Sequence, residues 1–252
     1  MAPVKVSESA LEFEDGPEGR LVIPLTVRRN RAARRISLRI DVPRRGAVLT
    51  LPQRTGIGAG LDFVAEKAMW LRNAYARLPA SVPFASGATI PFLGRPHRIE
   101  HRPEGKGGVW REDEGVDGGA RACIVVTGAA EHLSRRLTDW LKREALAVLD
   151  ARTRAAAALI GKSVARVSVR DTRSRWGSCA RDGRVHYSWR LVLAPEAVLD
   201  YVVAHEVAHL VYMSHGPRFR ATLDRLTPHR REAEAWLRVH GAGLLLIGAS
   251  FG

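Results

Sequence analysis

The chain has 252 residues, of which 46% are hydrophobic and 26% are charged, with a formal net charge of +14. This is the composition of an ordinary soluble globular protein, long enough for one large domain or two modest ones. No stretch approaches the roughly 18 apolar residues that a membrane span needs. The polar, acidic N-terminus has no apolar run of the secretory-signal type, so neither export nor a membrane is expected.

Two further features of the composition bear on location and partners. Cys123 and Cys179 are the two cysteines and form no C-x-x-C pair, which favours free thiols in a reducing cytoplasm. The basic excess is mostly arginine, and it can attract DNA or another polyanion. Because charge alone supplies only a non-specific attraction, compositional bias is the simpler explanation.

In the first third of the chain, apolar and polar residues alternate as they do in β-strands. Ile36, Leu38 and Ile40 alternate with polar residues, and we interpret residues 21–52 as an antiparallel meander. Residues 28–45 hold eight arginines against one acidic residue, Asp41. They form either a docking face for a polyanion or an acidic peptide, or a solvated strand face, which is the interpretation that we prefer.

Residues 59–78 have the spacing of an amphipathic helix, which Pro79 ends. A hairpin is expected over 88–102, with surface histidines at His97 and His101. A glycine-rich loop over 103–120 and a short strand over 122–128 follow. We therefore expect an N-terminal β-rich region with one helix over residues 1–130, and a second domain over 131–252.

The second region begins with one long helical pattern, residues 133–160, for which Gly161 is a natural stop. Alternation predicts a strand over 165–170 and another over 185–193. Pro195 and Glu196 then mark the start of a further helix, against which the long helix should pack.

That further helix carries the chemistry. Within it, His205 and His209 are four residues apart and therefore share one face, where both imidazoles can bind one divalent metal. Glu206 is offset by one position and can serve a water on that metal as general base. Apolar residues surround the helix nearly all round, so it is buried, and these three polar groups need a partner there.

The third metal ligand must come from beyond the helix. His215 is the nearest candidate, six residues after His209, although Tyr212 stands where the related metzincin pattern has a turn-forming glycine. Glu232 or Glu234 is a rival at longer spacing, and we prefer His215. Zinc is the default ion for three histidines and a water.

The strand preceding the helix would border the metal, where a peptide substrate can pair with it as an added strand. Four nearby residues are candidates to line that cleft: Arg175, Trp176, Ser178 and Arg190. For each of them a purely structural role is an equal alternative, in the core, in an ion pair or in a turn.

Three blocks of sequence carry a family resemblance: R-x-R-W-G-S-C at 173–179, W-R-L-x-x-A-P at 189–195, and Y-V-V-A-H-E-x-x-H-L at 201–210 followed by His215. Together they resemble the YgjP-like metallopeptidase family, which is related to the SprT-like and WLM proteases. The resemblance implies an α+β protein with a zincin-like catalytic domain behind an N-terminal β-rich region. It also implies metal ligation by His205, His209 and His215. One departure is Ser188, where asparagine is expected before Trp189.

The sequence therefore predicts a cytoplasmic zinc metallopeptidase that hydrolyses a protein or peptide substrate through a metal-bound water, with Glu206 as base. SprT-like relatives act on proteins bound to DNA, so the resemblance adds weight to DNA as a partner. The alternative is a basic nucleic-acid-binding module, or a DNA-associated protease, in which the metal site is structural or regulatory.

Overall fold

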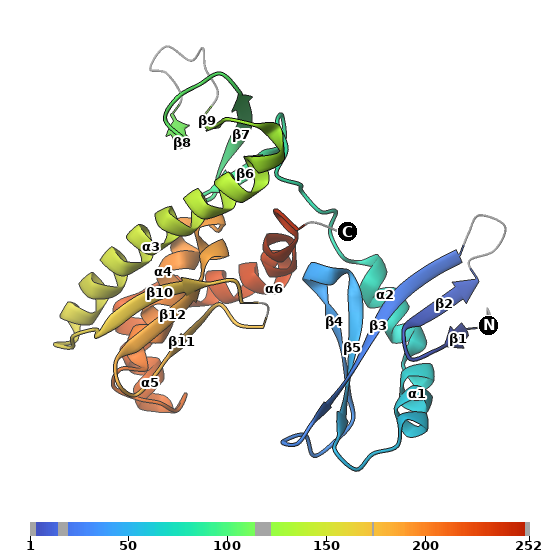
Figure 1. Ribbon diagram of the computed structural model, residues 1–252. Helices are drawn as coiled ribbons and strands as arrows, with labels where there is room; N and C mark the ends of the chain where they lie inside the picture. The colour runs from blue at the N-terminus through green and yellow to red at the C-terminus, as the bar shows by residue number, and fades with distance from the viewer. Residues whose placement is uncertain (1–3, 15–19, 114–121, 173, 250–252) are drawn as a thin grey trace. The chain divides into compact units, whose positions relative to one another are not determined.

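The computed structural model describes residues 4–14, 20–113, 122–172 and 174–249, and we restrict the account to them. The protein is a mixed α+β structure, with six α-helices and three small sheets in the described part of the chain (Figure 1). It divides into two compact units, Met1–Ala80 and Ser81–Ser250, each with its own hydrophobic core.

The first unit is built on a five-stranded sheet. Its order is β1-β2-β3-β5-β4, with bounds Val4–Val6, Ala10–Glu14, Arg20–Asn30, Gly46–Pro52 and Ser37–Asp41. β3 and β5 pair in parallel, so the expected antiparallel meander is wrong in that part. The reason is that β5 inserts between β3 and β4. β3 therefore lies beside β5 and not beside β4, the strand that follows it in sequence.

Two helices cover this sheet where one was expected. α1 (Ile57–Glu66) ends at Lys67, whose N–H donates to the carbonyls of both Phe63 and Val64, and α2 (Ala68–Ala76) starts at the next residue. The tightened last turn divides the predicted helix of residues 59–78 in two. Buried apolar residues from both helices join the sheet in one core.

The second unit begins with a four-stranded sheet of order β6-β7-β9-β8, with bounds Thr89–Phe92, Arg95–Arg102, Cys123–Thr127 and Val109–Glu112. The expected hairpin is confirmed, and both turn residues, Leu93 and Gly94, have positive φ as a two-residue hairpin requires. β8 lies inside the segment that was expected to be a loop. Its pairing with β9 defines it as a strand, and that pairing cannot be predicted from the residues of β8 alone. Residues 114–121 of that segment lie outside the described residues.

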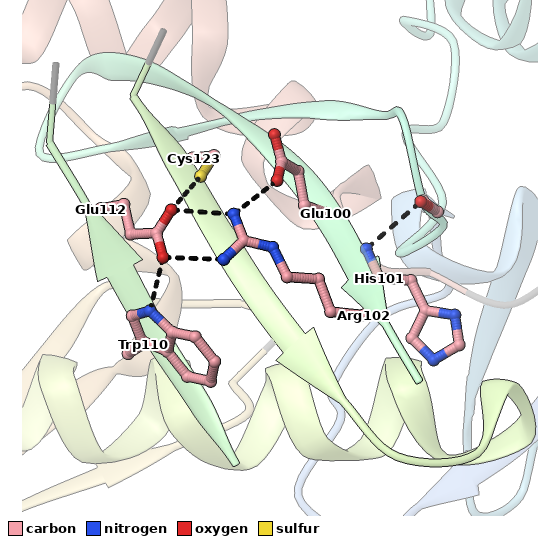
Figure 2. Close-up of polar contacts among 7 residues, drawn as sticks. Glu100, His101, Arg102, Trp110, Glu112 and Cys123 are labelled. Atoms are coloured by element: carbon pink, nitrogen blue, oxygen red, sulfur yellow. Dashed lines mark hydrogen bonds and ion pairs between the residues drawn. The ribbon is translucent and has the colours of Figure 1, made fainter. Parts of the chain in front are cut away.

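His97 is buried rather than at the surface, because the odd-numbered positions of β7 face the core. Its Nδ1 donates to the carbonyl of Arg95 at 2.9 Å. The even-numbered Arg102 instead forms a polar network with Glu100 and with Glu112 of β8, each 2.9 Å away (Figure 2). The hydrogen bonds from Arg102 to Glu112 lower the pKa of Glu112 to about 2, and the network connects β7 with β8 across the intervening β9.

The rest of this unit surrounds one long helix. α3 (Leu133–Leu159) contacts β8 and β9 at one end and β10 nearer the other, and it packs against α4 as expected (Figure 1). A three-stranded sheet follows, of order β10-β12-β11, with bounds Arg166–Arg170, Arg184–Ser188 and Gly177–Cys179. The strand expected over 185–193 ends at Ser188, and Trp189–Leu193 form a 3-10 helix, η4.

Three helices complete the second unit: α4 (Glu196–Ala208), α5 (Pro217–Leu226) and α6 (Arg230–Leu246). The boundary between units falls at Ala80, not at residue 130, because the sheet β6–β9 shares a core with α3 and α4. In the described ranges, no helix has both the length and the apolar character needed to span a bilayer.

Candidate metal centre

The site is built on α4, which begins after Pro195 as the sequence predicts. α4 packs against α3, α5, α6 and β11, so most of its side chains are buried. Its apolar residues lie on all sides, which is the pattern of a helix enclosed by neighbours. This enclosure fixes His205 and Glu206 in its last turn.

The chain leaves α4 through a tight turn. α4 ends at Ala208, and His209 caps it in ordinary right-handed backbone. The N–H groups of Val211 and Tyr212 both bond to the carbonyl of Ala208. Among the described residues other than glycine, positive φ occurs at Arg45 and Leu93, so Tyr212 needs no left-handed backbone. The turn therefore does without the glycine of the metzincin pattern.

This turn brings the three predicted ligands together. One ring nitrogen from each of His205, His209 and His215 lies within 4.8 Å of the others. The Nε2 atoms of His205 and His215 are 3.1 Å apart. His215 is exposed, whereas the other two rings are half-buried, so the cluster is open to solvent on one side.

Hydrogen bonding fixes which nitrogen of His209 faces the cluster. Its Nδ1 is 2.9 Å from the carbonyl oxygen of Tyr212 and must donate to it, which leaves the lone pair on Nε2. Burial, together with the neighbouring His209 and His215, lowers the pKa of His205 to about 4. Burial also lowers the pKa of His209. Both rings are therefore neutral near pH 7, as metal ligands must be.

Phe219 of α5 supports the cluster. Its ring centroid lies 5.1 Å from that of His205 and 4.7 Å from those of His209 and His215. Phe219 is 2% exposed, so it forms a rigid apolar surface against all three imidazoles. Sequence reasoning missed this residue, because an aromatic residue on the apolar face of a helix ordinarily indicates core packing.

The residues present fit a zinc ion. Donor nitrogens around a tetrahedral zinc lie about 3.3 Å apart, since each Zn–N bond is about 2.0–2.1 Å. The His205–His215 pair, 3.1 Å apart, matches this spacing, and all three nitrogens lie within 4.8 Å of one another. Glu234, one of the rival ligands, instead accepts a hydrogen bond from the Tyr201 hydroxyl at 3.0 Å, and neither it nor Glu232 belongs to the cluster.

Glu206 is a buried carboxyl beside this cluster, 5% exposed. Burial raises its pKa to about 7, against the opposing effects of the Arg175 charge and of a hydrogen bond from the Cys179 backbone. A carboxyl with a pKa near neutrality can both accept and return a proton at physiological pH. Its environment is therefore suited to acid–base chemistry.

β11 runs directly beside Glu206. Gly177 packs so closely that an added Cβ would lie 2.6 Å from the Glu206 Cγ and Oε1 atoms. β11 pairs with β12 along one side and is the last strand of its sheet, so its other edge has no strand partner among the described residues. Gly177 and Cys179 were not among the predicted site residues, although they lie inside the block 173–179.

The four predicted cleft residues divide into two pairs. Arg175 and Ser178 line a pocket of about 290 Å³ beside β11. Trp176 packs in the core and lies close to Gly241 of α6. Arg190 is buried in an ion pair with Asp171, and its guanidinium lies 4.3 Å from the Trp189 ring centroid. Arg173, the first residue of the block, lies outside the described residues.

Comparison with known proteins agrees with this geometry. A family described as a YgjP-like metallopeptidase domain matches residues 34–240, which is most of the chain. The matched family is thus one of metallopeptidase domains. The chain belongs to this YgjP-like family. No curated protein and no solved structure matches the chain.

Proposed function

We propose that the protein is a zinc-dependent peptidase with a zincin-like catalytic unit. The observation that carries the proposal is the meeting of three imidazole nitrogens within 4.8 Å, next to a buried glutamate. His205, His209 and His215 would hold the ion, and no fourth ligand group joins them among the described residues. Because structural zinc sites usually have four protein ligands, this set favours catalysis.

A bound zinc ion would act as a Lewis acid on the scissile carbonyl and would make a water acidic enough to attack it. Glu206 would accept a proton from the attacking water and would deliver it to the leaving amine. Burial raises the pKa of Glu206 to about 7, which makes its carboxylate a stronger base than that of an exposed glutamate.

The substrate would bind as an extended strand along the open edge of β11. Backbone groups at such an edge pair with any peptide sequence, and pockets on either face then select side chains. The close packing of Gly177 against Glu206 places this edge beside the base.

The experiment compares wild-type protein with Glu206→Gln, both loaded with zinc. Loss of peptide hydrolysis with full zinc content is the expected result, because glutamine keeps the size of the side chain and cannot take a proton. Hydrolysis that survives the substitution would overturn the role of Glu206. A second variant, Glu234→Gln, removes a carboxylate that bonds to Tyr201 and serves as the matched control.

A separate observation in the first unit supports DNA or another polyanion as a partner. Seven of the eight arginines between residues 28 and 45 are exposed, whereas Asp41, the one acid among them, is buried. Such a surface would bind DNA in a salt-dependent manner. A DNA mobility-shift assay tests this binding. The shift should weaken at higher salt and in an Arg31→Gln/Arg34→Gln/Arg35→Gln variant; equal binding by that variant would contradict a role for these arginines.

A further inference from the structure

We propose that the pocket beside β11 is a subsite for an acidic side chain of the substrate, so that the enzyme prefers peptides with glutamate or aspartate near the cleaved bond. The pocket is lined by Arg170, Thr172, Arg175, Gly177, Ser178 and His186. The inference rests on the proposed peptidase function, because it assumes a peptide strand paired with β11.

The polar face of the three-stranded sheet forms one side of the pocket. Ser168, His186 and Ser178 are direct partners across β10, β12 and β11, so their side chains stand in one row. The alternate residues Val167 and Val185 are buried, which places the row on the opposite, outward face. A peptide added to β11 would extend this row with one of its own side chains.

The row is held in a single hydrogen-bonded state. Arg170 Nη2 lies 3.3 Å from His186 Nε2, and arginine can only donate, so Nε2 accepts. His186 Nδ1 then carries the proton and donates to Ser168 Oγ. His186 is consequently neutral, and the other guanidinium donors of Arg170 have no hydrogen-bond partner among the described residues.

Two arginines and no acidic residue line the pocket among the described residues, and the charge of Arg175 also acts on the neighbouring Glu206. Arg170 and Arg175 are exposed, and neither forms an ion pair in the described ranges. Burial and then the charges of Arg170, Arg184 and Arg166 lower the pKa of His186, with Asp182 as the opposing charge. Asp182 is paired with Arg184 at 2.8 Å. The groups that face the pocket are therefore hydrogen-bond donors and cations, which select an anion.

Gly177 connects the pocket to the reaction site. It lines the pocket and also packs directly against the Glu206 carboxyl. A side chain in the pocket and a peptide bond near Glu206 can therefore belong to neighbouring residues of one strand, whose side chains alternate in direction. The small pocket and its position favour a single carboxylate on a peptide over the repeated phosphates of a DNA duplex.

The test measures binding as well as cleavage. The substrates are pairs of short extended peptides, and the two members of a pair differ only in having Glu or Gln at one position. That position is moved from pair to pair through the residues around the cleaved bond. Dissociation constants are measured with full-length, zinc-loaded Glu206→Gln protein, and kcat/KM with wild-type protein. At the position that enters the pocket, we expect the glutamate peptide to bind about tenfold more tightly than the matched glutamine peptide.

The matched variants are Arg170→Glu and Arg166→Glu. Both lie on β10 and change charge equally, and only Arg170 lines the pocket. Arg170→Glu should lose the preference for glutamate and gain one for a lysine peptide, which a merely structural role would not produce. Arg166→Glu should retain most of the glutamate preference, because Arg166 does not line the pocket and acts only on the charge of His186.

Equal binding of the glutamate and glutamine peptides at every position would overturn the proposal, as would a glutamate preference that survives Arg170→Glu. Equal binding of the two peptides, together with DNA binding that Arg170→Glu abolishes, would instead assign the pocket to nucleic-acid phosphate. Failure of the peptidase function is distinguishable, because hydrolysis would then be absent or independent of Glu206 while the difference in binding between the two peptides remained.

Discussion

Gly177 lies so close to Glu206 that there is no room between them for a methyl group: a Cβ at Gly177 would stand 2.6 Å from Glu206 Oε1. The glycine thus sets the position of the buried carboxyl from the side of β11. This contact joins the edge strand to the candidate base and leads to the first prediction.

Gly177→Ala should move the Glu206 carboxyl without touching the histidines. We expect kcat to fall about 10- to 100-fold, since displacement of a catalytic group by about 1 Å costs up to that factor, with zinc content unchanged. Steady-state kinetics and metal analysis check this. Gly58→Ala, where nothing lies within 4 Å of the added carbon, is the control and should keep full activity. Normal kcat in Gly177→Ala would contradict the contact.

Phe219→Leu should weaken zinc binding about tenfold, because residues that orient metal ligands typically contribute 10- to 100-fold to affinity. A leucine leaves space beside the three imidazoles, which Phe219 now contacts from one side. Competition with a zinc chelator measures the affinity. Phe13→Leu removes an equally buried ring from the core of the first unit and should leave zinc affinity unchanged. Equal affinities in both variants would show that Phe219 does not orient the ligands.

Removal of metal should lower the stability of the second unit. Zinc at about a thousand times its dissociation constant stabilises the folded state by about 4 kcal/mol, provided that the unfolded chain does not bind it. Thermal unfolding with zinc and with chelator gives the difference. In a His209→Ala/His215→Ala variant the two curves should coincide. A wild-type protein that is indifferent to the chelator would argue against a metal at the cluster.

Both cysteines should be slow to alkylate at pH 8. Burial and nearby carboxylates raise the pKa of Cys123 to about 11, and burial followed by the charges of Glu206 and Asp182 does the same for Cys179. A raised pKa keeps a thiol protonated until the pH approaches it, so reaction should accelerate as the pH rises toward the cited value of about 11. Mass spectrometry after iodoacetamide treatment, with urea-unfolded protein as the reference, should show about hundredfold slower reaction in the folded state. Equal rates would contradict the burial of these thiols.

Two helices of the second unit, α3 and α4, could be predicted from sequence because their signals are local, whereas α5 and α6 were not predicted. The apolar period of residues 133–160 and the helix start at Pro195 each need only neighbouring residues, and both agree with α3 and α4. The spacing of His205, His209 and His215 likewise predicted the cluster, because a turn of six residues has few ways to return to the end of a helix.

What could not be predicted depends on distant pairing. The parallel pairing of β3 with β5 and the insertion of β5 beside β4 depend on strand order, which alternation does not encode. The Gly177–Glu206 contact joins residues far apart in sequence. The burial of Arg190 against Asp171 and Trp189 also arises from tertiary packing, whereas an arginine in a sequence suggests exposure.

The most direct test of the central claim is anomalous diffraction at the zinc edge from crystals of the zinc-loaded protein. We expect a single ion bound by the imidazoles of His205, His209 and His215, with one coordination position left to solvent on the side of Glu206. Zinc bound elsewhere, or a fourth protein side chain in that position, would contradict it.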